Sequence, residues 1–122
     1  MPDGSKELQV VLNIEIKTTE GVEFLILEGE IDMYVAPQIR GTLLNASNVC
    51  EKAVAIDLNS VSYMDSSGIA TLIEGLQVTK RRGARLVLFG VQPNVMDMLR
   101  LAKLHDFFEV YQTEREALEN LC

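Results

Sequence analysis

Residues that commonly build metal centres and catalytic pairs are scarce in this chain of 122 residues. There are two cysteines, Cys50 and Cys122, and a single histidine, His105. The cysteines show no C-x-x-C spacing, so the sequence predicts neither a zinc site nor a thiol–histidine pair. We expect no bound metal, with Cys50 near the end of a helix and Cys122 at the chain terminus.

Long apolar runs are also lacking. No stretch approaches the roughly 18 residues that a membrane-spanning helix needs, and the first residues, MPDGSKELQ, are polar and acidic. A secretory signal would begin with basic residues and continue with an apolar segment. We therefore expect a cytoplasmic protein without a membrane partner.

Positive charge is in the minority. Eleven Lys and Arg residues face 18 Asp and Glu residues, which gives a net charge of −7. Nucleic-acid affinity depends on cationic side chains that release counterions from the phosphate backbone, so we expect no nucleic-acid partner. The basic cluster 80–82, with Arg85 behind it, falls where a helix is expected to end, and cations there complement the helix dipole.

What the sequence does contain is a regular alternation of apolar segments with two periodicities. Period-two or continuous apolar runs predict strands, and apolar residues at helical spacing predict helices. The expected strands are 10–16, 22–27, 53–58, 84–89 and 107–111, and the expected helices are 35–46, one from Ile69 to about 82, one from Pro93, and 114–121. Such alternation predicts an α/β fold with a mixed, mostly parallel β-sheet of four to five strands and about four α-helices. The length suits one domain, 10–122, after an N-terminal tail, 1–9.

Several details of the helices can be predicted. Gly21 marks a turn between the first two strands, Gly83 is placed as a helix C-cap, and Thr113 is an expected N-cap with Glu116 as its capping-box partner. In the third helix Leu99 is expected to face the core together with Met96. The second helix is expected to bury the stripe Ile69, Leu72, Ile73 and Leu76.

The most informative segment is VSYMDSSGIA, residues 61–70. It lies between the strand expected at 53–58 and the helix that begins near Ile69, so residues 65–68 are expected in a loop and the first helical turn. Ligand sites in open α/β sheets lie at the carboxyl ends of strands, where this loop should be. The segment is therefore our candidate functional site.

Two interpretations of this site stay open from the residues alone. In the first, Asp65 or Ser66 is an ordinary N-cap that stabilises the helix by about 1 kcal/mol. In the second, Ser66 is a phosphorylation switch, because a phosphate of about −1.5 to −2 charges would lie beside free backbone N–H groups and the positive end of the helix dipole. Repulsion from Asp65 would offset part of that gain.

This segment and four others resemble one known family. They are LEGEID at 27–32, VAIDL at 54–58, VSYMDSSG at 61–68, GARLVL at 83–88 and VQPNV at 91–95. The first resembles the L-x-G-E-L/I-D pattern of the STAS domain family, and the next two resemble the strand, loop and phosphorylation site of its bacterial anti-sigma factor antagonists. The likeness spans about Val10 to Leu121.

The resemblance implies that Ser66 is the phosphoacceptor, with Ser67 beside it on the helix and Asp32 nearby in the fold. It also implies partner switching. The unphosphorylated protein would bind an anti-sigma factor that is a serine kinase using ATP, and would thereby release the sigma factor. Phosphorylation by that kinase would end the binding, and the circuit leaves room for a serine phosphatase.

No G-x-x-x-x-G-K-[S/T] loop occurs in the chain, so ATP would belong to the partner. We therefore expect a binding protein without a cofactor and without catalytic activity. Around Ser66, the expected docking surface combines the loop 32–35, the first helical turn with Asp65, Ser67 and Gly68, and the exposed side of that helix. Two residues of the loop, Met33 and Tyr34, are of types common at interfaces, although Met33 could equally fill the core.

Three other functions fit parts of the sequence. Asp57 could be the phosphoacceptor of a response-regulator receiver, but the acidic pair and the lysine of such a site are missing, and a hydrogen bond at the strand end explains Asp57 better. A serine hydrolase would need a G-x-S-x-G elbow and a base, for which His105 is the sole candidate, and we expect His105 to be partly buried and structural. A STAS scaffold module of a stress-signalling or a lipid- or anion-transport complex, without a phosphoswitch, is the remaining alternative.

Overall fold

The computed structural model describes residues 13–121. Its strands are β1 (Asn13–Thr19), β2 (Val22–Ile31), β3 (Ala53–Met64), β4 (Arg85–Phe89) and β5 (Glu109–Tyr111), and its helices are α2 (Ala36–Val49), α3 (Ser66–Arg81), α4 (Pro93–Leu101) and α5 (Glu114–Leu121). The strands form one sheet in the order β1-β2-β3-β4-β5. β1 pairs with β2 in antiparallel fashion, and all other neighbours are parallel. The predicted α/β fold with a mostly parallel sheet is confirmed.

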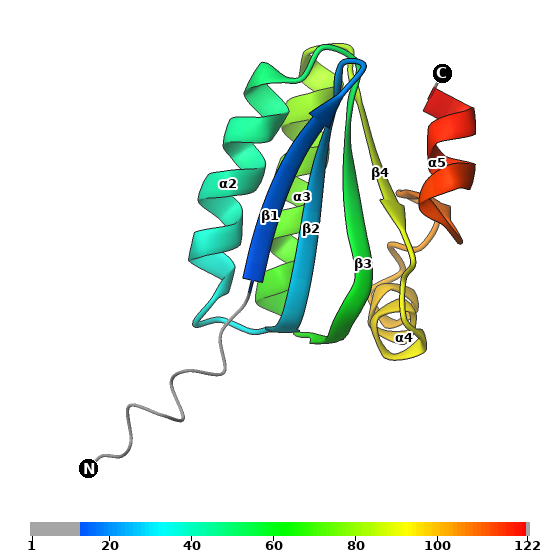
Figure 1. Cartoon of the computed structure of the whole chain (residues 1–122). Coiled ribbons are helices and arrows are strands. Elements are labelled where there is room, and N and C mark those ends of the chain that lie inside the picture. The colour runs from blue at the N-terminus through cyan, green and yellow to red at the C-terminus, as the bar shows by residue number, and fades with distance from the viewer. Residues whose placement is uncertain (1–12, 122) are drawn as a thin grey trace.

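Helices cover both faces of this sheet. Figure 1 shows α2 and α3 side by side on one face and α5 on the other. Along β3, Val54 and Ile56 pack into the core under α2 and α3, whereas Ala55 packs into the smaller core under α5. In that smaller core the rings of Phe24 and Phe89 meet edge to face at 6.4 Å. Burial on both faces explains why the middle of β3 is a continuous apolar run.

β2 and β3 are longer than we predicted from their apolar runs. The sequence pattern ended them at 27 and 58, but they continue to Ile31 and Met64, and these two residues are partners in the sheet. The pairing shifts register twice along the way, which breaks the alternation that the prediction relied on. The extension matters because it carries both strand ends to the candidate site.

The buried side of α3 also differs from the predicted stripe. Ile69 and Leu72 are buried as expected, but Ile73 and Leu76 are only half-buried. Gly75 lies in the contact with α2 instead, where a Cβ atom would lie 2.7 Å from Leu43 Cδ2. Because small residues let the two helices approach closely, α2 occupies the space above Gly75 and leaves Ile73 and Leu76 at the border of the core.

Most of the smaller predictions are confirmed. The β1–β2 turn has positive φ angles at Glu20 and Gly21, and Gly83 follows α3 with φ 75°. Thr113 Oγ1 accepts the backbone N–H of Glu116, whose own carboxylate accepts from Gln112 N–H. In α4, Leu99 is buried, whereas Met96, expected in the core, is half-buried.

One residue of the basic cluster at the end of α3, Arg82, has a structural role. Cys50, which is buried, ends α2, and Arg82 Nη1 donates to the carbonyl oxygens of Ser47 and Cys50 at 2.8 and 3.0 Å. Arg82 thus satisfies carbonyls that the last turn of α2 leaves unpaired. In residues 13–121, no helix is long and apolar enough to cross a membrane.

A polar network fastens the last strand to the sheet. Arg85 binds both carboxylate oxygens of Glu109, and its Nη1 donates to Asn120 O in α5 at 3.0 Å. The hydroxyl of Tyr111 also donates to Glu109. The hydrogen bonds from Arg85 lower the pKa of the Glu109 carboxyl below its usual value.

Gly75→Ala should destabilise the protein by about 1–3 kcal/mol, because the added methyl group overpacks the contact with Leu43. Gly41→Ala is the matched control: Gly41 lies in α2 with open space around its Cβ position, so alanine there should stabilise by about 0.4–1 kcal/mol. Urea unfolding measures both free energies. Stabilisation by both substitutions would show that α2 and α3 are not in close contact at Gly75.

Glu109→Gln should lower the free energy of unfolding at pH 7 by less than about 1 kcal/mol, because the ion pair with Arg85 is partly exposed. A lowered pKa in the folded state stabilises above the unfolded pKa, near 4.3, and this stabilisation is lost as pH falls through the folded value. The variant and the wild type should therefore converge in urea unfolding at acidic pH. Glu119→Gln, at an exposed pair within α5, serves as control; a difference that persists at low pH would contradict the ionic cause.

Candidate functional site

The candidate site forms where β2 and β3 end side by side. Ile31 and Met64 are paired, so the loop that leads to α2 and the residue that precedes α3 start next to each other. The backbone N–H of Asp65 donates to Ile31 O at 3.0 Å, which continues the pairing by one residue. Figure 1 shows this end of the sheet where α2 and α3 begin.

Asp65 connects the two loops through its side chain. One carboxylate oxygen accepts the backbone N–H groups of Ser67 at 2.8 Å and Gly68 at 3.3 Å, which makes Asp65 the N-cap of α3. The other oxygen accepts the N–H of Met33 at 3.2 Å. A single carboxylate thus starts the helix and holds the neighbouring loop against it.

Asp32 organises the start of α2 in a similar way. Its Oδ1 accepts the N–H groups of Tyr34 at 2.9 Å and Val35 at 3.3 Å, and its backbone oxygen accepts from Ala36 at 2.9 Å. These bonds form a turn before α2 and give Asp32 a structural role. The structure also brings Asp32 and Asp65 to adjacent loops, since both loops meet at Met33.

The two serines differ in exposure. Ser66 is the first residue of α3 and is exposed, whereas Ser67 is half-buried and its carbonyl oxygen accepts from Thr71 Oγ1 at 3.0 Å. A modifying enzyme therefore has access to Ser66 at the surface. The predicted phosphoacceptor is the more accessible serine of the pair.

Gly68 lets the first turn of α3 lie directly on the strand ends. A Cβ atom at this position would lie 2.5 Å from Met64 Cγ and 2.8 Å from Ile31 Cγ2. Both neighbours are buried, so neither has space to move away. The glycine of the DSSG motif is thus explained by packing.

One expectation about Ser66 is wrong. We expected unpaired N–H groups at the start of α3 that could hold a phosphate, but the N–H groups of Ser67 and Gly68 already donate to Asp65. The carboxylate also supplies the negative charge that the helix dipole favours at this end. A phosphate on Ser66 would stand beside that carboxylate rather than in an anion-binding cradle.

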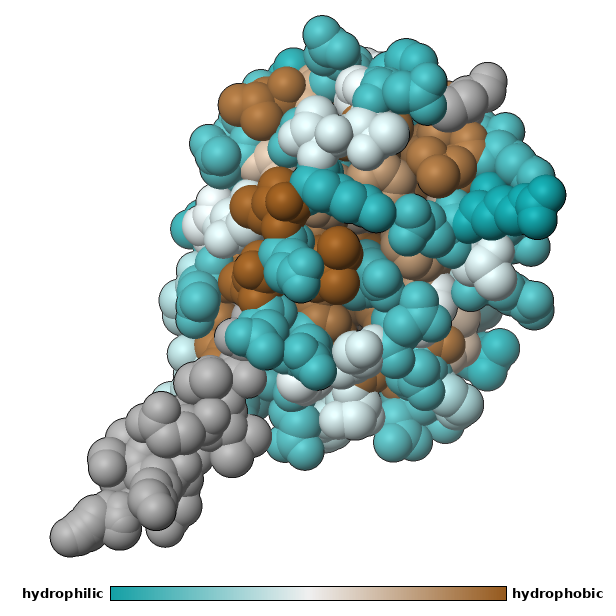
Figure 2. Space-filling view, in the orientation of Figure 1, coloured by the Kyte–Doolittle hydropathy of each residue, from teal (hydrophilic) through white to brown (hydrophobic). Residues whose placement is uncertain are grey.

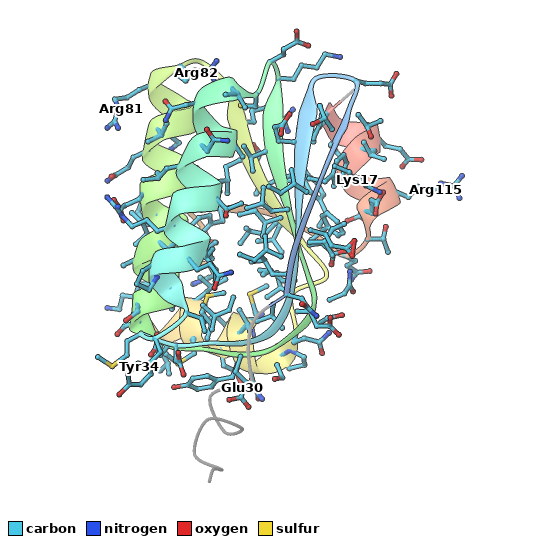
Figure 3. The ribbon with its side chains drawn as sticks, turned by 60° about the vertical axis from the view of Figure 1, so that its left-hand side comes forward. Lys17, Glu30, Tyr34, Arg81, Arg82 and Arg115 are labelled. Atoms are coloured by element: carbon cyan, nitrogen blue, oxygen red, sulfur yellow. The ribbon has the colours of Figure 1, made fainter. Side chains whose placement is uncertain are left out.

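Large apolar side chains are exposed around Ser66. Met33 is 62% exposed, Tyr34 84% and Tyr63 45%. We call the two tyrosines, together with Met33, the aromatic rim. Because Met33 is exposed, it does not fill the core, which was the alternative that the sequence left open. Tyr63 was missed by sequence reasoning because we ended its strand at residue 58. In Figure 3, Tyr34 and Glu30 lie at the end of the molecule opposite Arg81 and Arg82.

The exposed side of α3 that was expected to dock a partner carries an ion pair with α2. Arg40 donates to both carboxylate oxygens of Glu74, at 2.8 and 2.9 Å. The hydrogen bonds from Arg40 lower the pKa of the Glu74 carboxyl, and those to Glu74 raise the pKa of Arg40. Figure 2 shows that on one face of the molecule hydrophilic side chains surround small, separate groups of hydrophobic atoms.

The residues behind the rival functions are placed as well. Asp57 Oδ1 accepts both the backbone and side-chain N–H of Asn59 at 2.9 Å, so the expected hydrogen bond is present, but Asp57 lies within β3 and not at its end. His105 is exposed rather than partly buried, and its Nε2 lies 3.6 Å from Asp106 Oδ2. Within residues 13–121, no three His, Cys, Asp or Glu side chains are grouped so that they could hold a metal ion.

Comparisons with known proteins agree on one family. The family model of the STAS domain matches residues 13–117. The anti-sigma-B factor antagonist of Listeria monocytogenes serovar 1/2a is 31% identical over 110 residues, which cover 89% of this chain and 95% of that protein.

Solved structures share the fold at lower identity. An anti-sigma factor antagonist from Mycobacterium paratuberculosis matches with a TM-score of 0.83 at 22% identity, over 91% of this chain and 94% of that one. The Bacillus cell fate determinant SpoIIAA in its phosphorylated form matches with a TM-score of 0.72 at 20% identity, over 90% of this chain and 100% of that one.

Asp65→Ala should lower the free energy of unfolding by about 1–2 kcal/mol, because it removes the cap of α3 and leaves the N–H of Met33 without its acceptor. Asp65→Asn keeps the oxygen that caps the helix and should cost less. Asp106→Ala, at an exposed side chain, is the control. Equal urea-unfolding free energies for the Asp65→Ala and Asp106→Ala variants would show that Asp65 does not connect the loops.

Proposed function

This chain belongs to the STAS domain family, and we propose that it is an anti-sigma factor antagonist whose partner binding is switched off by phosphorylation of Ser66. The observation that carries the proposal is the exposed Ser66 at the start of α3, between the aromatic rim and the carboxylate of Asp65. The names of its relatives support the antagonist role.

In the unphosphorylated state, the aromatic rim and the first turn of α3 form the docking surface. Exposed Met and Tyr side chains contribute buried area at interfaces with little loss of conformational freedom for the aromatic residue. Asp65 holds this surface in one arrangement, because its carboxylate fixes the loop of Met33 against α3. The partner is an anti-sigma factor with serine kinase activity, and its capture releases the sigma factor.

Phosphorylation changes the charge at the centre of this surface. A phosphate adds about −1.5 to −2 charges, and the N–H groups of Ser67 and Gly68 are already bonded to Asp65. The new charge therefore faces the partner instead of being absorbed by the helix. Loss of about 2.7 kcal/mol of binding free energy is enough to weaken the complex a hundredfold.

The chain acts in this scheme as a ligand and a phosphate acceptor, not as a catalyst. ATP is bound by the partner, since the sequence has no phosphate-binding glycine loop of the G-x-x-x-x-G-K-[S/T] type. The switch operates in the cytoplasm, where a sigma factor acts, and a serine phosphatase restores the binding form.

One observation favours a second function, that of a constitutive scaffold module. Asp65 and Gly68 both have complete structural explanations, as a cap and as a packing residue. A STAS domain without a phosphoswitch would need these two residues just as much. The two functions differ in whether Ser66 is modified and in whether the partner is an anti-sigma factor kinase.

Mass spectrometry after incubation with ATP and the anti-sigma factor kinase of the same genome tests the modification. We expect a single added phosphate on a peptide that contains Ser66, and its loss in the Ser66→Ala variant. Ser62→Ala removes another exposed serine nearby and should leave the phosphate in place. An unmodified wild-type protein with every candidate kinase of that genome would favour the scaffold.

Binding to the same kinase tests the switch. Ser66→Ala should bind as tightly as the wild type. Ser66→Asp should bind about tenfold to a hundredfold more weakly, because it adds a negative charge to the docking surface. The loss should be smaller than for the phosphorylated protein, since a carboxylate carries less charge than a phosphate. Tyr34→Ala should also weaken binding, by tenfold or more. Isothermal titration calorimetry measures all three, with Ser62→Asp as the control for added charge. Equal affinity of the Ser66→Asp variant and the wild type would rule out the switch.

A further inference from the structure

A second surface feature lies on α3, away from Ser66. It is an apolar pocket of about 290 Å³ between α3 and the segment that leads from α4 to β5. Its lining residues are Ile73, Leu76, Gln77, Lys80, Leu104, Phe107 and Phe108. At 1.5 Å per residue, the part of α3 that lines the pocket begins roughly 10 Å along the helix from Ser66 and ends roughly 21 Å from it.

The pocket lies where two large apolar side chains of α3 pack against the edge of the main core and stay partly exposed. Ile73 and Leu76 have the spacing of core residues, yet both are only half-buried. Phe107 lies on the opposite wall and is 62% exposed, whereas the adjacent Phe108 is buried. An exposed aromatic ring beside half-buried aliphatic side chains is a surface that would gain from an apolar occupant.

The polar part of the lining is just as informative. Lys80 is the single charged residue among the seven that line the pocket, and it is exposed at the border of the apolar surface. It is not part of any ion pair among residues 13–121, in contrast to Arg40 and Arg85. In a chain of net charge −7, an ammonium group beside an apolar pocket selects an occupant with an apolar body and an anionic end.

We propose that this pocket binds a medium-chain carboxylate, with the alkyl chain between α3 and Phe107 and the carboxylate next to Lys80. The volume is at the small end of ligand pockets, which hold about 300–1,000 Å³. At roughly 30 Å³ for each methylene group, about the share of a water molecule in the liquid, the pocket holds a chain of eight to ten carbons. This proposal is independent of the phosphoswitch, because Ser66 and the aromatic rim take no part in it.

Isothermal titration calorimetry with the full chain and hexanoate, octanoate and decanoate, each below its micelle concentration, tests the pocket. Each buried methylene raises affinity about fourfold, so two should raise it about fifteenfold. The gain should stop near ten carbons, when the pocket is full. Affinity that keeps rising at the same rate through dodecanoate and tetradecanoate, or no binding at millimolar ligand, would overturn the proposal.

Matched variants test the charge and the location. Lys80→Gln should weaken decanoate binding about tenfold and leave decanamide, which is uncharged, unchanged. Arg81→Gln removes a neighbouring cation that does not line the pocket and should alter neither ligand. Leu76→Asp should abolish binding of both, with circular dichroism to confirm folding, and Ile73→Ala provides a milder test that should weaken both about fourfold or more.

Two outcomes of these variants would count against the pocket. Equal losses for Lys80→Gln and Arg81→Gln would mean that decanoate responds to the general charge of the helix end. Retention of full affinity by both the Leu76 and Ile73 variants would place the ligand elsewhere. An acidic peptide that binds at this surface, under conditions in which decanoate does not, would assign the pocket to a protein partner and overturn the assignment to a small carboxylate.

Discussion

The carboxylate of Asp65 is the interaction on which the candidate site depends. It accepts three backbone N–H groups, two from the first turn of α3 and one from Met33. A carboxylate can accept that many bonds because it has two oxygens with about four lone-pair positions, and its charge suits the helix N-terminus. Ser66 follows Asp65 directly, so the same bonds that start the helix keep this serine at the surface. Ser66 is exposed, and the side chain of the neighbouring Asp65 is fully hydrogen-bonded.

The length of β2 and β3 explains why these loops meet at all. Both strands continue beyond the apolar runs of the sequence and end at Ile31 and Met64, which are paired and buried in the main core. Gly68 then allows α3 to lie on these two side chains without a gap, since any Cβ atom there would collide with them. The backbone around Ser66 is therefore supported from below by the sheet and from the side by Asp65. Such support suits a surface that has to present one arrangement to a partner, because little conformational entropy is left to lose on binding.

Sequence alone predicted the α/β fold with its mostly parallel sheet, which the structure confirms, and it pointed to the DSSG segment as the candidate site, because both follow from local patterns. The apolar run around Ile56 and the DSSG segment are each readable within a few residues. The prediction failed where contacts between residues far apart in the sequence decide which side chains are buried. Ile73 has core spacing, but α2 approaches α3 at Gly75 and takes the buried side. Tyr63 became part of the exposed rim because sheet pairing continued through register shifts that no local pattern reveals. The bond from Met33 to Asp65 spans 32 residues, so the link between the two loops was also invisible in the sequence.

α3 connects two surfaces of different chemistry, and the distance between them limits how they can influence each other. Ser66 and Lys80 are separated by roughly 21 Å along the helix, about twice the screening length of about 8–10 Å at physiological ionic strength. The charge of a phosphate on Ser66 would thus be largely screened before it reached Lys80. Mechanical coupling would require α3 to shift as a body, which its close contact with Leu43 at Gly75 opposes. The two ends of the helix are therefore able to bind independently, and a ligand near Lys80 would add a second input to the protein without altering the charge at the first.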